Sequence, residues 1–499
     1  MELLIPREVR QIGLLLLQRG FSACLVGGCV RDLLRGVVPK DWDIATSALP
    51  EQIQEIFPDS VYENTFGTVG VKTRSLDPAV SIVEVTTFRT EAAYSDGRHP
   101  DSVSFVSSIE DDLSRRDFTV NAMAIDLALL VSNISSLTLS DISASIIDPY
   151  GGQDDLKQRR IRAVGDPVAR FREDGLRMMR AVRFSAHLDF SIEENTFRAI
   201  VQQSELLSSI AHERIRDELT NMIMTPRGDS AVYLLEDTGL LRFVLPELRE
   251  GIGCGQNKHH IYSVFEHNVR ALGYAVSQNY SLVVRMASLL HDVGKPRSKR
   301  GEGPDSTFYN HDAIGATLTV AMLDRLHFPR DFVRRVSHLV RHHLFYYNVG
   351  EVTEAGVRRF IARVGADCID DLFKVREADR IGSGVPKAIP YKTRHLQFMI
   401  DKVRRDPISV KMLVIDGADV MRILSLAPSA RVGTILSILL EEVLDDPTLN
   451  TVEHLTARVS ALGALSDEAL SQLASYAKQK VYEAESGAEA DMKKKHFIR

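Results

Sequence analysis

Residues 25–46 read LVGGCVRDLLRGVVPKDWDIAT and predict a strand, a glycine turn, a short helix and a second strand. Gly27 and Gly28 end an apolar run, so a buried strand stops in a tight turn. Because glycine has no Cβ, backbone N–H groups at this turn can approach a ligand closely. The N-terminus of the following helix favours an anion, and Arg31 adds donors suited to phosphate. This half of the stretch predicts a phosphate-binding turn.

The other half carries two carboxylates. On a strand, Asp41 and Asp43 point the same way, while Trp42 points into the opposite layer. Adjacent carboxylates repel each other unless a cation neutralises them, and hard oxygen ligands beside a phosphate-binding turn suit Mg²⁺. Either half alone would usually be an ordinary turn or a solvated strand end, but together they predict phosphoryl or nucleotidyl transfer. Glu84, on a later strand, is either a third carboxylate near the metal or an exposed strand residue.

The chain has 499 residues, which is too long for one compact core, so several domains are expected. The net charge of −6 excludes a protein that is basic throughout, but RNA binding depends on local clusters such as Arg170–Arg183 and Lys493–Lys495. The four cysteines are scattered, which favours a reducing compartment. No stretch reads as a signal peptide or reaches membrane-spanning length, so we expect a cytoplasmic protein without a membrane partner.

Helical and strand patterns alternate up to residue 147, and the chain beyond is almost wholly helical, which predicts the α+β class. Residues 89–105 lack periodicity and predict a long functional or mobile loop. Arg115 and Arg116 follow that loop directly, which favours contact with phosphate over a solvated helix end. The turn at Asp148–Gly152 predicts the first domain boundary.

Residues 170–184, RFREDGLRMMRAVRF, predict a helix with charged side chains at every third position. A carboxylate only accepts hydrogen bonds and a guanidinium only donates them. Asp174 and Arg177, one turn apart, therefore complement both cytosine and adenine, which each offer an amino donor beside a ring-nitrogen acceptor. Uracil and guanine would leave buried polar groups unpaired, at about 1–3 kcal/mol each. Arg180 and Arg183 continue the positive stripe toward the triphosphate or the base. A salt-bridged surface helix is the alternative.

Five ordered motifs over about the first 220 residues resemble the class II tRNA nucleotidyltransferases, the family of CCA-adding enzymes and poly(A) polymerases. They are GGCVRD with DWD, RRDFTVNAMA, DPYGGQDDL, EDGLRMMRAVRF and HERIRDEL. The resemblance implies a five-stranded nucleotidyltransferase head with a mixed sheet at residues 1–147 and a helical neck at 148–250. It implies that Asp41 and Asp43 hold catalytic Mg²⁺. It also implies a nucleotide-binding set of Gly27, Gly28, Arg31, Arg116, Asp174, Arg177, Arg180 and Arg183.

Histidines and aspartates recur after residue 250 in HHIYSVFEHNVRAL, LLHDVGKPRSK, YNHDAIGA and READR. Lone histidines are more often core or surface residues, but this mixed set of nitrogen and oxygen ligands predicts metal binding. The stretch resembles the HD phosphohydrolase superfamily. That resemblance implies an all-α HD-type body at 251–385 with Lys295 within reach of phosphate. The implied ligands of a divalent transition metal are His267, His291, Asp292 and Asp379, with His311 and His342 as candidates for a second metal.

The implied reaction is template-independent addition of C, C and A to tRNA 3′ ends from CTP and ATP, by two-metal in-line displacement of pyrophosphate. The loop at 89–105 has the length found in CCA-adding members. A poly(A) polymerase or an enzyme that adds only A shares the same motifs and stays an alternative. A phosphohydrolase that uses the head as an RNA-binding module is a further one. Residues 410–455 resemble the C-terminal part of the same family, which implies a helical, tRNA-binding tail at 386–480, followed by a basic C-terminal tail at 481–499.

Overall fold

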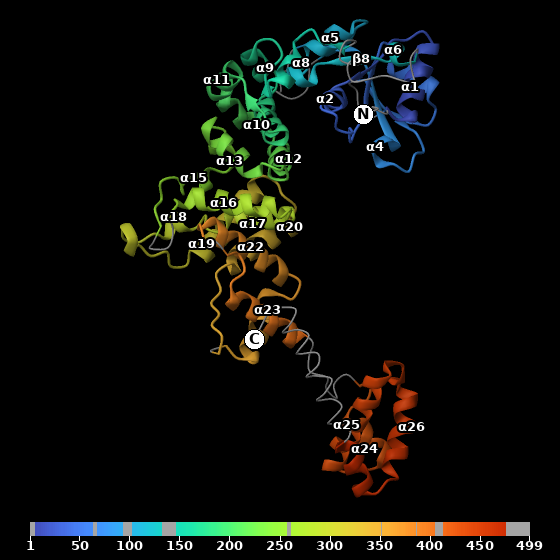
Figure 1. Ribbon diagram of the computed structural model, residues 1–499, viewed down its shortest axis with the longest axis vertical. Helices are drawn as coiled ribbons and strands as arrows, with labels where there is room; N and C mark the ends of the chain where they lie inside the picture. Colours follow the sequence, from blue (N-terminus) through green and yellow to red (C-terminus); the bar gives the residue numbers. More distant parts are fainter. Residues whose placement is uncertain are drawn as a thin grey trace. The chain divides into compact units, whose positions relative to one another are not determined.

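The computed structural model describes residues 5–62, 67–92, 102–131, 146–256, 261–350, 352–385, 387–404 and 413–475. The chain divides into two compact units (Figure 1). The first comprises residues 1–343 and 374–385, and the second comprises 344–373 and 386–499. The chain therefore leaves the first unit after His343 and returns to it for one short segment. No helix of the described part is long and apolar enough to cross a membrane.

A seven-stranded mixed sheet forms the centre of the head. Neighbouring strands are antiparallel except β2 and β5, which run parallel. The resemblance implied five strands, and the short outermost strands bring the number to seven. In spatial order the strands are β3 (Ser60–Tyr62), β4 (Thr68–Lys72), β5 (Ile82–Thr87), β2 (Asp43–Thr46), β1 (Ala23–Val26), β8 (Ala124–Asp126) and β9 (Ile146–Ile147).

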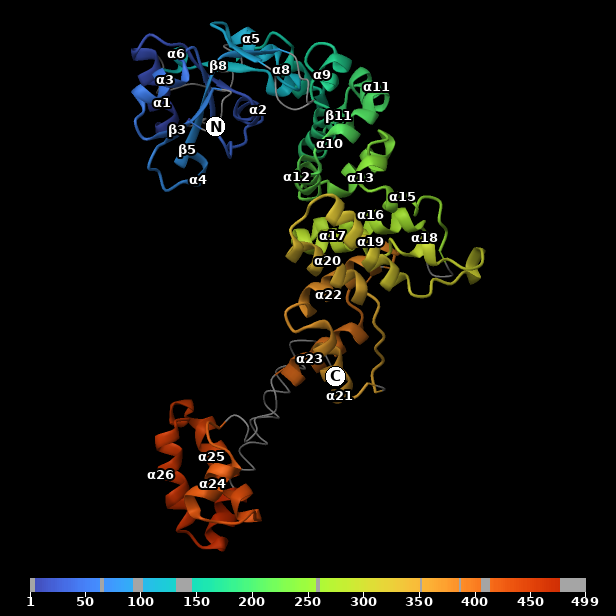
Figure 2. The same cartoon turned by 180° about the vertical axis from the view of Figure 1, so that it is seen from behind.

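Helices cover both faces of this sheet (Figure 2). One face packs on α1 (Arg7–Gln18), α2 (Gly28–Leu34) and α3 (Pro50–Ile56), and the other packs on α5 (Ile109–Ser114). Side chains alternate between the two faces of a strand, and both faces are covered, so β1 is buried at all of its positions. Short helices α4 (Pro78–Ser81) and α6 (Leu127–Val131) and the 3₁₀ turn η1 (Thr119–Asn121) complete the head.

The position of the carboxylate stretch follows from this layering. Trp42 and Ile44 lie in the core beneath α1 and α2. Ala45 belongs to the opposite core, beside α5. Asp43 is two residues from Ala45, so its side chain lies on the α5 side of the sheet. The prediction that Trp42 faces the opposite layer from Asp43 is confirmed.

The predicted structureless loop at 89–105 is wrong at both ends. Arg89–Ala92 (β6) and Ser102–Phe105 (β7) pair as an antiparallel ribbon, with Arg89 opposite Phe105. The two segments form strands although neither has an alternating apolar pattern, because each satisfies the backbone N–H and C=O groups of the other. Residues 93–101 between them lie outside the described residues.

The neck is helical, with one short parallel pair of strands, β10 (Arg160–Ile161) and β11 (Ser191–Ile192). The predicted continuous helix over 170–184 is wrong, because it breaks at Asp174 and Gly175. Asp174 has extended backbone angles, and its carboxylate accepts from the Leu176 N–H at 3.0 Å, which caps the next helix. The helices are α8 (Gly152–Lys157), α9 (Pro167–Glu173), α10 (Leu176–Leu188), α11 (Glu194–Gln203), η2 (Ser204–Ser209), α12 (His212–Ile223) and α13 (Gly228–Asp237).

The HD-type region follows as a set of packed helices. Helix α16 packs against α17, α17 against α20, and α19 against α20. Helix α22 supplies the segment that returns to the first unit. The bounds are α14 (Leu241–Val244), α15 (Pro246–Arg249), α16 (Val264–Ser277), α17 (Leu282–Leu290), α18 (Lys295–Ser298), η3 (Gly303–Asp305), α19 (His311–Arg325), α20 (Arg330–His342) and α22 (Ile369–Gly382).

The second unit contains α21 (Glu354–Val364), α23 (Tyr391–Arg404), α24 (Gly417–Leu424), α25 (Ala430–Asp445), η5 (Pro447–Leu449) and α26 (Val452–Gly463). Helices α24 to α26 share one apolar core. Residues 344–373, which the sequence assigned to the HD-type body, group with this unit. The finer division into neck, body and tail stays a prediction. The basic tail 481–499, with Lys493–Lys495, and the pair His259-His260 lie outside the described residues.

Candidate functional sites

The carboxylates of the head gather at one end of the paired strands β2 and β5. Asp43 and Glu84 are direct partners in this parallel pair, so their side chains emerge side by side on one face of the sheet. Glu84 is exposed, as is Asp41, which lies just before β2 rather than on it. The structure thus brings Glu84 beside Asp43 and leaves it exposed, so its role as a third metal ligand stays a prediction.

The glycine turn and an arginine meet at Asp43. Gly27 has φ +77°, a left-handed conformation that favours glycine. A Cβ placed there would lie 3.0 Å from Arg116 Nη1 and 3.3 Å from Asp43 Oδ2. Arg116 directly follows α5, the helix on the Asp43 side of the sheet, and donates from Nη2 to Asp112 at 3.3 Å. A glycine turn, a carboxylate and a guanidinium therefore converge on one small space.

The electrostatics of Asp43 fit a cation. Burial raises the pKa of its carboxyl, the Arg116 guanidinium lowers it, and the negative charge of Asp41 raises it again, with a net upward shift. The carboxylate form is thus disfavoured where acidic side chains converge, and a bound cation would reverse this. The oxygen donors of Asp41, Asp43 and Glu84 are the hard ligands that Mg²⁺ prefers. These residues fit the predicted metal.

The sequence predicts that the Arg31 side chain is open to bind phosphate, but the structure places this side chain differently. Its side chain is buried and holds Asp32 through Nε and Nη2, at 3.0 and 2.9 Å. Its Nη1 donates to Asn121 at 2.7 Å. Arg31 therefore ties α2 to the turn η1 that precedes β8. Contact with the nucleotide stays a prediction for this residue.

Asp174 is held by an arginine that sequence reasoning did not single out. Arg214 of α12 donates to both carboxylate oxygens of Asp174, at 2.7 and 3.2 Å. Both Asp174 and its neighbour Arg177 are buried. Arg214 lies in the HERIRDEL motif, and the need of a buried carboxylate for a cationic partner was the available signal. The pair fixes the orientation of Asp174 at the junction of α9 and α10.

The three neck arginines also have acidic partners. Arg177 pairs with Glu173 at 2.5 Å, Arg180 with Asp117 at 2.6 Å, and Arg183 with Glu218 at 2.6 Å. Arg177 also donates to the Arg115 carbonyl at 3.2 Å, which joins the neck to the head. Burial raises the pKa of Asp117, but Arg180 and Arg177 outweigh it and the net pKa is lowered. These side chains form a fixed polar surface rather than a free positive stripe.

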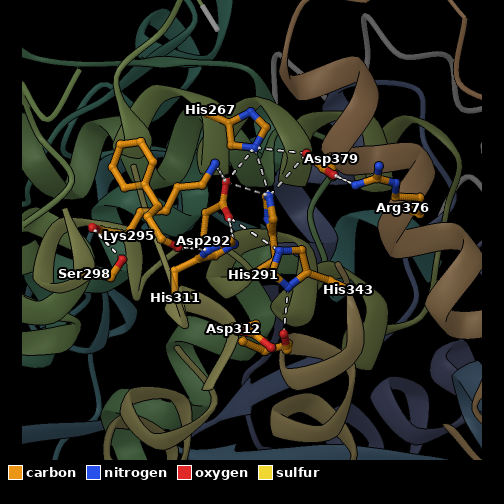
Figure 3. A network of polar contacts seen from close by, with 12 residues as sticks. His267, His291, Asp292, Lys295, Ser298, His311, Asp312, His343, Arg376 and Asp379 are labelled. Atoms are coloured by element: carbon orange, nitrogen blue, oxygen red, sulfur yellow. Dashed lines mark hydrogen bonds and ion pairs between the residues drawn. The ribbon is translucent and has the colours of Figure 1, made fainter. Parts of the chain in front are cut away.

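A compact cluster of buried imidazoles and carboxylates lies in the HD-type region (Figure 3). His267 Nε2 and His291 Nε2 are 2.9 Å apart. His267 Nε2 also lies 3.2 Å from Asp292 Oδ2 and 3.3 Å from Asp379 Oδ1. These are the four residues that the sequence predicted as ligands of one metal. They come from α16, the end of α17 and α22.

Through its other carboxylate oxygen, Asp292 also faces a second pair of histidines. His311 Nε2 and His343 Nε2 each lie 3.5 Å from Asp292 Oδ1. The sequence predicted His342 in this place, which is wrong, because His343 is the buried residue whose ring points into the cluster. His342 lies on the outer side of α20 against His338, with ring centroids 4.5 Å apart. Two groups of ligands thus share Asp292.

The tautomers of these histidines suit a metal. Nδ1 of His291, His311 and His343 lies 2.8, 2.6 and 2.7 Å from a backbone carbonyl three residues earlier. A carbonyl only accepts, so each Nδ1 carries the proton and donates it, which leaves Nε2 as a lone pair aimed at Asp292. Burial lowers the pKa of His291, but Asp292 and Asp379 outweigh it and raise the pKa to about 10, so a metal that binds Nε2 of His291 would displace a proton. Three inward lone pairs beside two carboxylates fit divalent metals.

Two further side chains orient the carboxylates. Arg376 Nη1 donates to Asp379 Oδ2 at 2.6 Å, so the other oxygen, Oδ1, faces the histidines. Lys295 Nζ lies 2.5 Å from Asp292 Oδ2 and donates to Gln256 at 2.7 Å. Sequence reasoning named Lys295 for phosphate but missed Arg376 and Gln256. For Arg376, the signal was its place one helical turn before Asp379.

Comparisons with known proteins match the head, the neck and the HD-type region. The model of the poly A polymerase head domain matches residues 23–162, that of the probable RNA and SrmB-binding site of polymerase A matches 189–252, and that of the HD domain matches 264–382. The A-adding tRNA nucleotidyltransferase of Deinococcus radiodurans is 35% identical over 434 residues, which cover 84% of this chain and 91% of the relative.

Other relatives match a smaller part. The CCA-adding enzyme of Geobacillus thermodenitrificans is 45% identical over 234 residues, 47% of this chain and about half (53%) of that enzyme. Among solved structures, the Bacillus stearothermophilus CCA-adding enzyme in complex with CTP has a TM-score of 0.58 at 28% identity. The match covers 92% of this chain and 98% of the chain of that enzyme. Head, neck and HD cluster together place this chain in the tRNA nucleotidyltransferase and poly(A) polymerase family, in a form that carries an HD domain.

Proposed function

We propose that this protein adds C, C and A to the 3′ ends of tRNA, using CTP and ATP and no nucleic-acid template. The observation that carries the proposal is the convergence of the Gly27 turn, the Asp43 carboxylate and the Arg116 guanidinium. Such a space suits a triphosphate, because backbone N–H groups and Arg116 can hold phosphate while carboxylates hold its cation.

The residues of the head divide the chemistry as follows. Mg²⁺ bound by Asp41 and Asp43 would lower the pKa of the RNA 3′-hydroxyl and neutralise the leaving pyrophosphate. Glu84, beside Asp43, adds a third oxygen donor. The N–H groups near Gly27 and Gly28 and the Nη1 of Arg116 orient the triphosphate for in-line attack at its α-phosphate. The reaction joins the RNA oxygen to that phosphate and releases pyrophosphate, so no protein nucleophile is required.

Base selection is assigned to Asp174 and Arg177. The carboxylate accepts the amino hydrogen of cytosine or adenine, and the guanidinium donates to the neighbouring ring nitrogen. Arg214 donates to both oxygens of Asp174 and thereby holds this carboxylate in a fixed orientation toward the base. Arg177→Ala should therefore lose discrimination against UTP and GTP while still transferring nucleotides. Wild-type selectivity in that variant would contradict the assignment.

An enzyme that adds only A is the second candidate, because the relative that covers 84% of this chain is an A-adding enzyme. Three tRNA acceptors separate the two candidates: one that ends before the first C, one that ends after C, and one that ends after CC. Each is incubated with labelled CTP or ATP alone and with both. The CCA proposal requires addition of C to the first two acceptors and of A to the third. Incorporation of A alone would contradict the CCA proposal.

We also propose that the HD cluster hydrolyses phosphate esters at RNA 3′ ends, with a divalent transition metal. Its support is the shared carboxylate of Asp292 between two histidine groups. The test measures hydrolysis of bis-p-nitrophenyl phosphate and of 2′,3′-cyclic nucleotides with Mg²⁺, Mn²⁺, Ni²⁺ and Co²⁺. We expect turnover with a transition metal that is lost in His291→Ala. Equal rates in wild type and this variant would reduce the cluster to a structural element.

A further inference from the structure

Helix α20 has a positively charged face that neither site uses. Its sequence is RDFVRRVSHLVRH, in which four arginines stand against one aspartate. The apolar side is buried, whereas all four arginines are exposed. The buried set is Val333, Val336, Leu339 and Val340, and the exposed set is Arg330, Arg334, Arg335 and Arg341.

The basic side chains share one side of the helix. At roughly 100° per residue, the four arginines fall within an arc of about 140°, which also holds the two histidines of α20. Its 13 residues span roughly 20 Å. Successive phosphates on a nucleic-acid strand lie only a few ångström apart (about 3.4 Å of axis in B-form DNA), so the face is long enough to meet several phosphates.

The ion pairs on this face leave its charge positive. Arg334 pairs with Asp331 at 3.2 Å, but these side chains are 77% and 88% exposed. Arg341 pairs with Asp312 of α19. Arg330 has no ion-pair partner among the described residues. Exposed pairs of this kind contribute little and exchange easily for another anion.

The ends of α20 connect the two functional regions. Just before it, the His327 Nδ1–H donates to the Glu213 carboxylate at 2.6 Å, and the His327 carbonyl accepts from Arg216 at 2.7 Å. Both partners lie on α12, the helix whose Arg214 holds Asp174. Just after it, His343 enters the HD cluster. The basic face therefore runs from the neck to that cluster.

We infer that the exposed face of α20 binds the sugar-phosphate backbone of tRNA. A chain with a net charge of −6 that concentrates four arginines on one helix face offers local complementarity to a polyanion. The inference rests on the proposed function for the identity of the RNA. Because the contacts are to phosphate, they are independent of base sequence.

The test uses the full-length protein and a tRNA that lacks its CCA end. The variant Arg334→Glu/Arg335→Glu is compared with Lys72→Glu/Arg74→Glu, a matched pair of exposed basic residues on the head. In both, two positive charges become negative. The Kd for tRNA is measured at several salt concentrations, and the KM for ATP is measured in the addition assay. Arg334→Gln/Arg335→Gln removes the charges without adding acidic ones and serves if the glutamate variant folds poorly.

We expect the α20 variant to bind tRNA about tenfold more weakly and its log Kd to depend less on log salt, by roughly two in slope. The head control should match wild type, and the KM for ATP should change in neither. Equal tRNA affinity in the α20 variants and the control would overturn the inference and leave an acidic protein partner for this face. If the wild type binds tRNA at α20 but adds no nucleotide, the proposed function fails while the surface stands.

Discussion

The head and the HD region each gather acidic side chains for a cation, but they do so in opposite environments. In the head, Asp41 and Glu84 are exposed, and the site opens toward the space beside Gly27. In the HD region, His267 and His291 are fully buried, and the candidate ligand atoms of His267, His291 and Asp292 lie within 4.8 Å of one another. The candidate ligands of the head are therefore open to a substrate, whereas those of the HD cluster are enclosed by the protein.

Removing the central head carboxylate should have the largest effect. Asp43→Ala deletes the carboxylate nearest the glycine turn, so nucleotide addition should fall roughly 1,000-fold or more, the equivalent of several kcal/mol of metal stabilisation. Metal binding by the HD cluster should stay at the wild-type level, as measured by metal stoichiometry. A variant that retains more than a tenth of wild-type addition would show that the two sites do not divide the chemistry as proposed.

The second test separates adjacent histidines in the HD cluster. His343→Ala removes a lone pair aimed at Asp292, so about one equivalent of Mn²⁺ or Ni²⁺ per chain should be lost in metal titrations without nucleotide. His342→Ala is the matched control, since it removes the neighbouring imidazole from the outer face of α20. Equal loss of metal in both variants would argue against the shared-carboxylate arrangement.

A smaller effect is expected where the neck supports the head. Arg214→Ala leaves the buried Asp174 carboxylate without its bidentate partner, so selectivity for ATP and CTP over UTP and GTP should drop roughly tenfold. The control Arg216→Ala, on the same helix, loses contacts to Asp217 and His327 instead. Single-nucleotide incorporation assays measure both. Unchanged selectivity in Arg214→Ala would show that other residues hold Asp174 in its orientation.

The smallest expected effect concerns the ion pair that connects the end of the neck to the HD helices. Arg325 holds Glu247 through two hydrogen bonds at 2.6 and 2.8 Å. Burial raises the pKa of Glu247, but these bonds outweigh it and lower the pKa from its ordinary value of 4.5. A lowered folded-state pKa contributes stability above the unfolded pKa, and that stability is lost as the pH falls through the folded value.

Arg325→Ala should therefore lower the free energy of unfolding by about 1 kcal/mol at pH 7, and the deficit should shrink as the pH falls below 4.5. Denaturant unfolding at a series of pH values measures this. The control Arg198→Ala breaks an exposed pair with Glu194 and should change stability by less than about 0.5 kcal/mol. A loss of stability in Arg325→Ala that grows as the pH falls would contradict the predicted direction of the pH dependence.

The α+β class and the positions of β1, α2 and Asp43 were predictable because apolar runs and glycine turns act locally. The four predicted HD ligands also come together, since each lies in a short motif. The break at Asp174 was not predicted, because a capping carboxylate overrides a helical charge pattern. His343 was predictable but missed: it follows the buried Leu339 and Val340 by four and three residues, on the same helix face. Arg214 depends on a contact between residues 40 apart, which no local pattern encodes.

The return of residues 374–385 to the first unit sets an order of assembly on the ribosome. The chain passes through another unit between His343 and this segment, which carries Asp379. The head and the neck residues up to Arg214 precede this segment in the chain, so they can fold while the HD cluster still lacks Asp379. A nascent chain stalled between Arg214 and Asp379 would contain all the candidate residues of the head and neck but an incomplete HD cluster. Maturation of the second centre is therefore a late, separate event in the life of the protein.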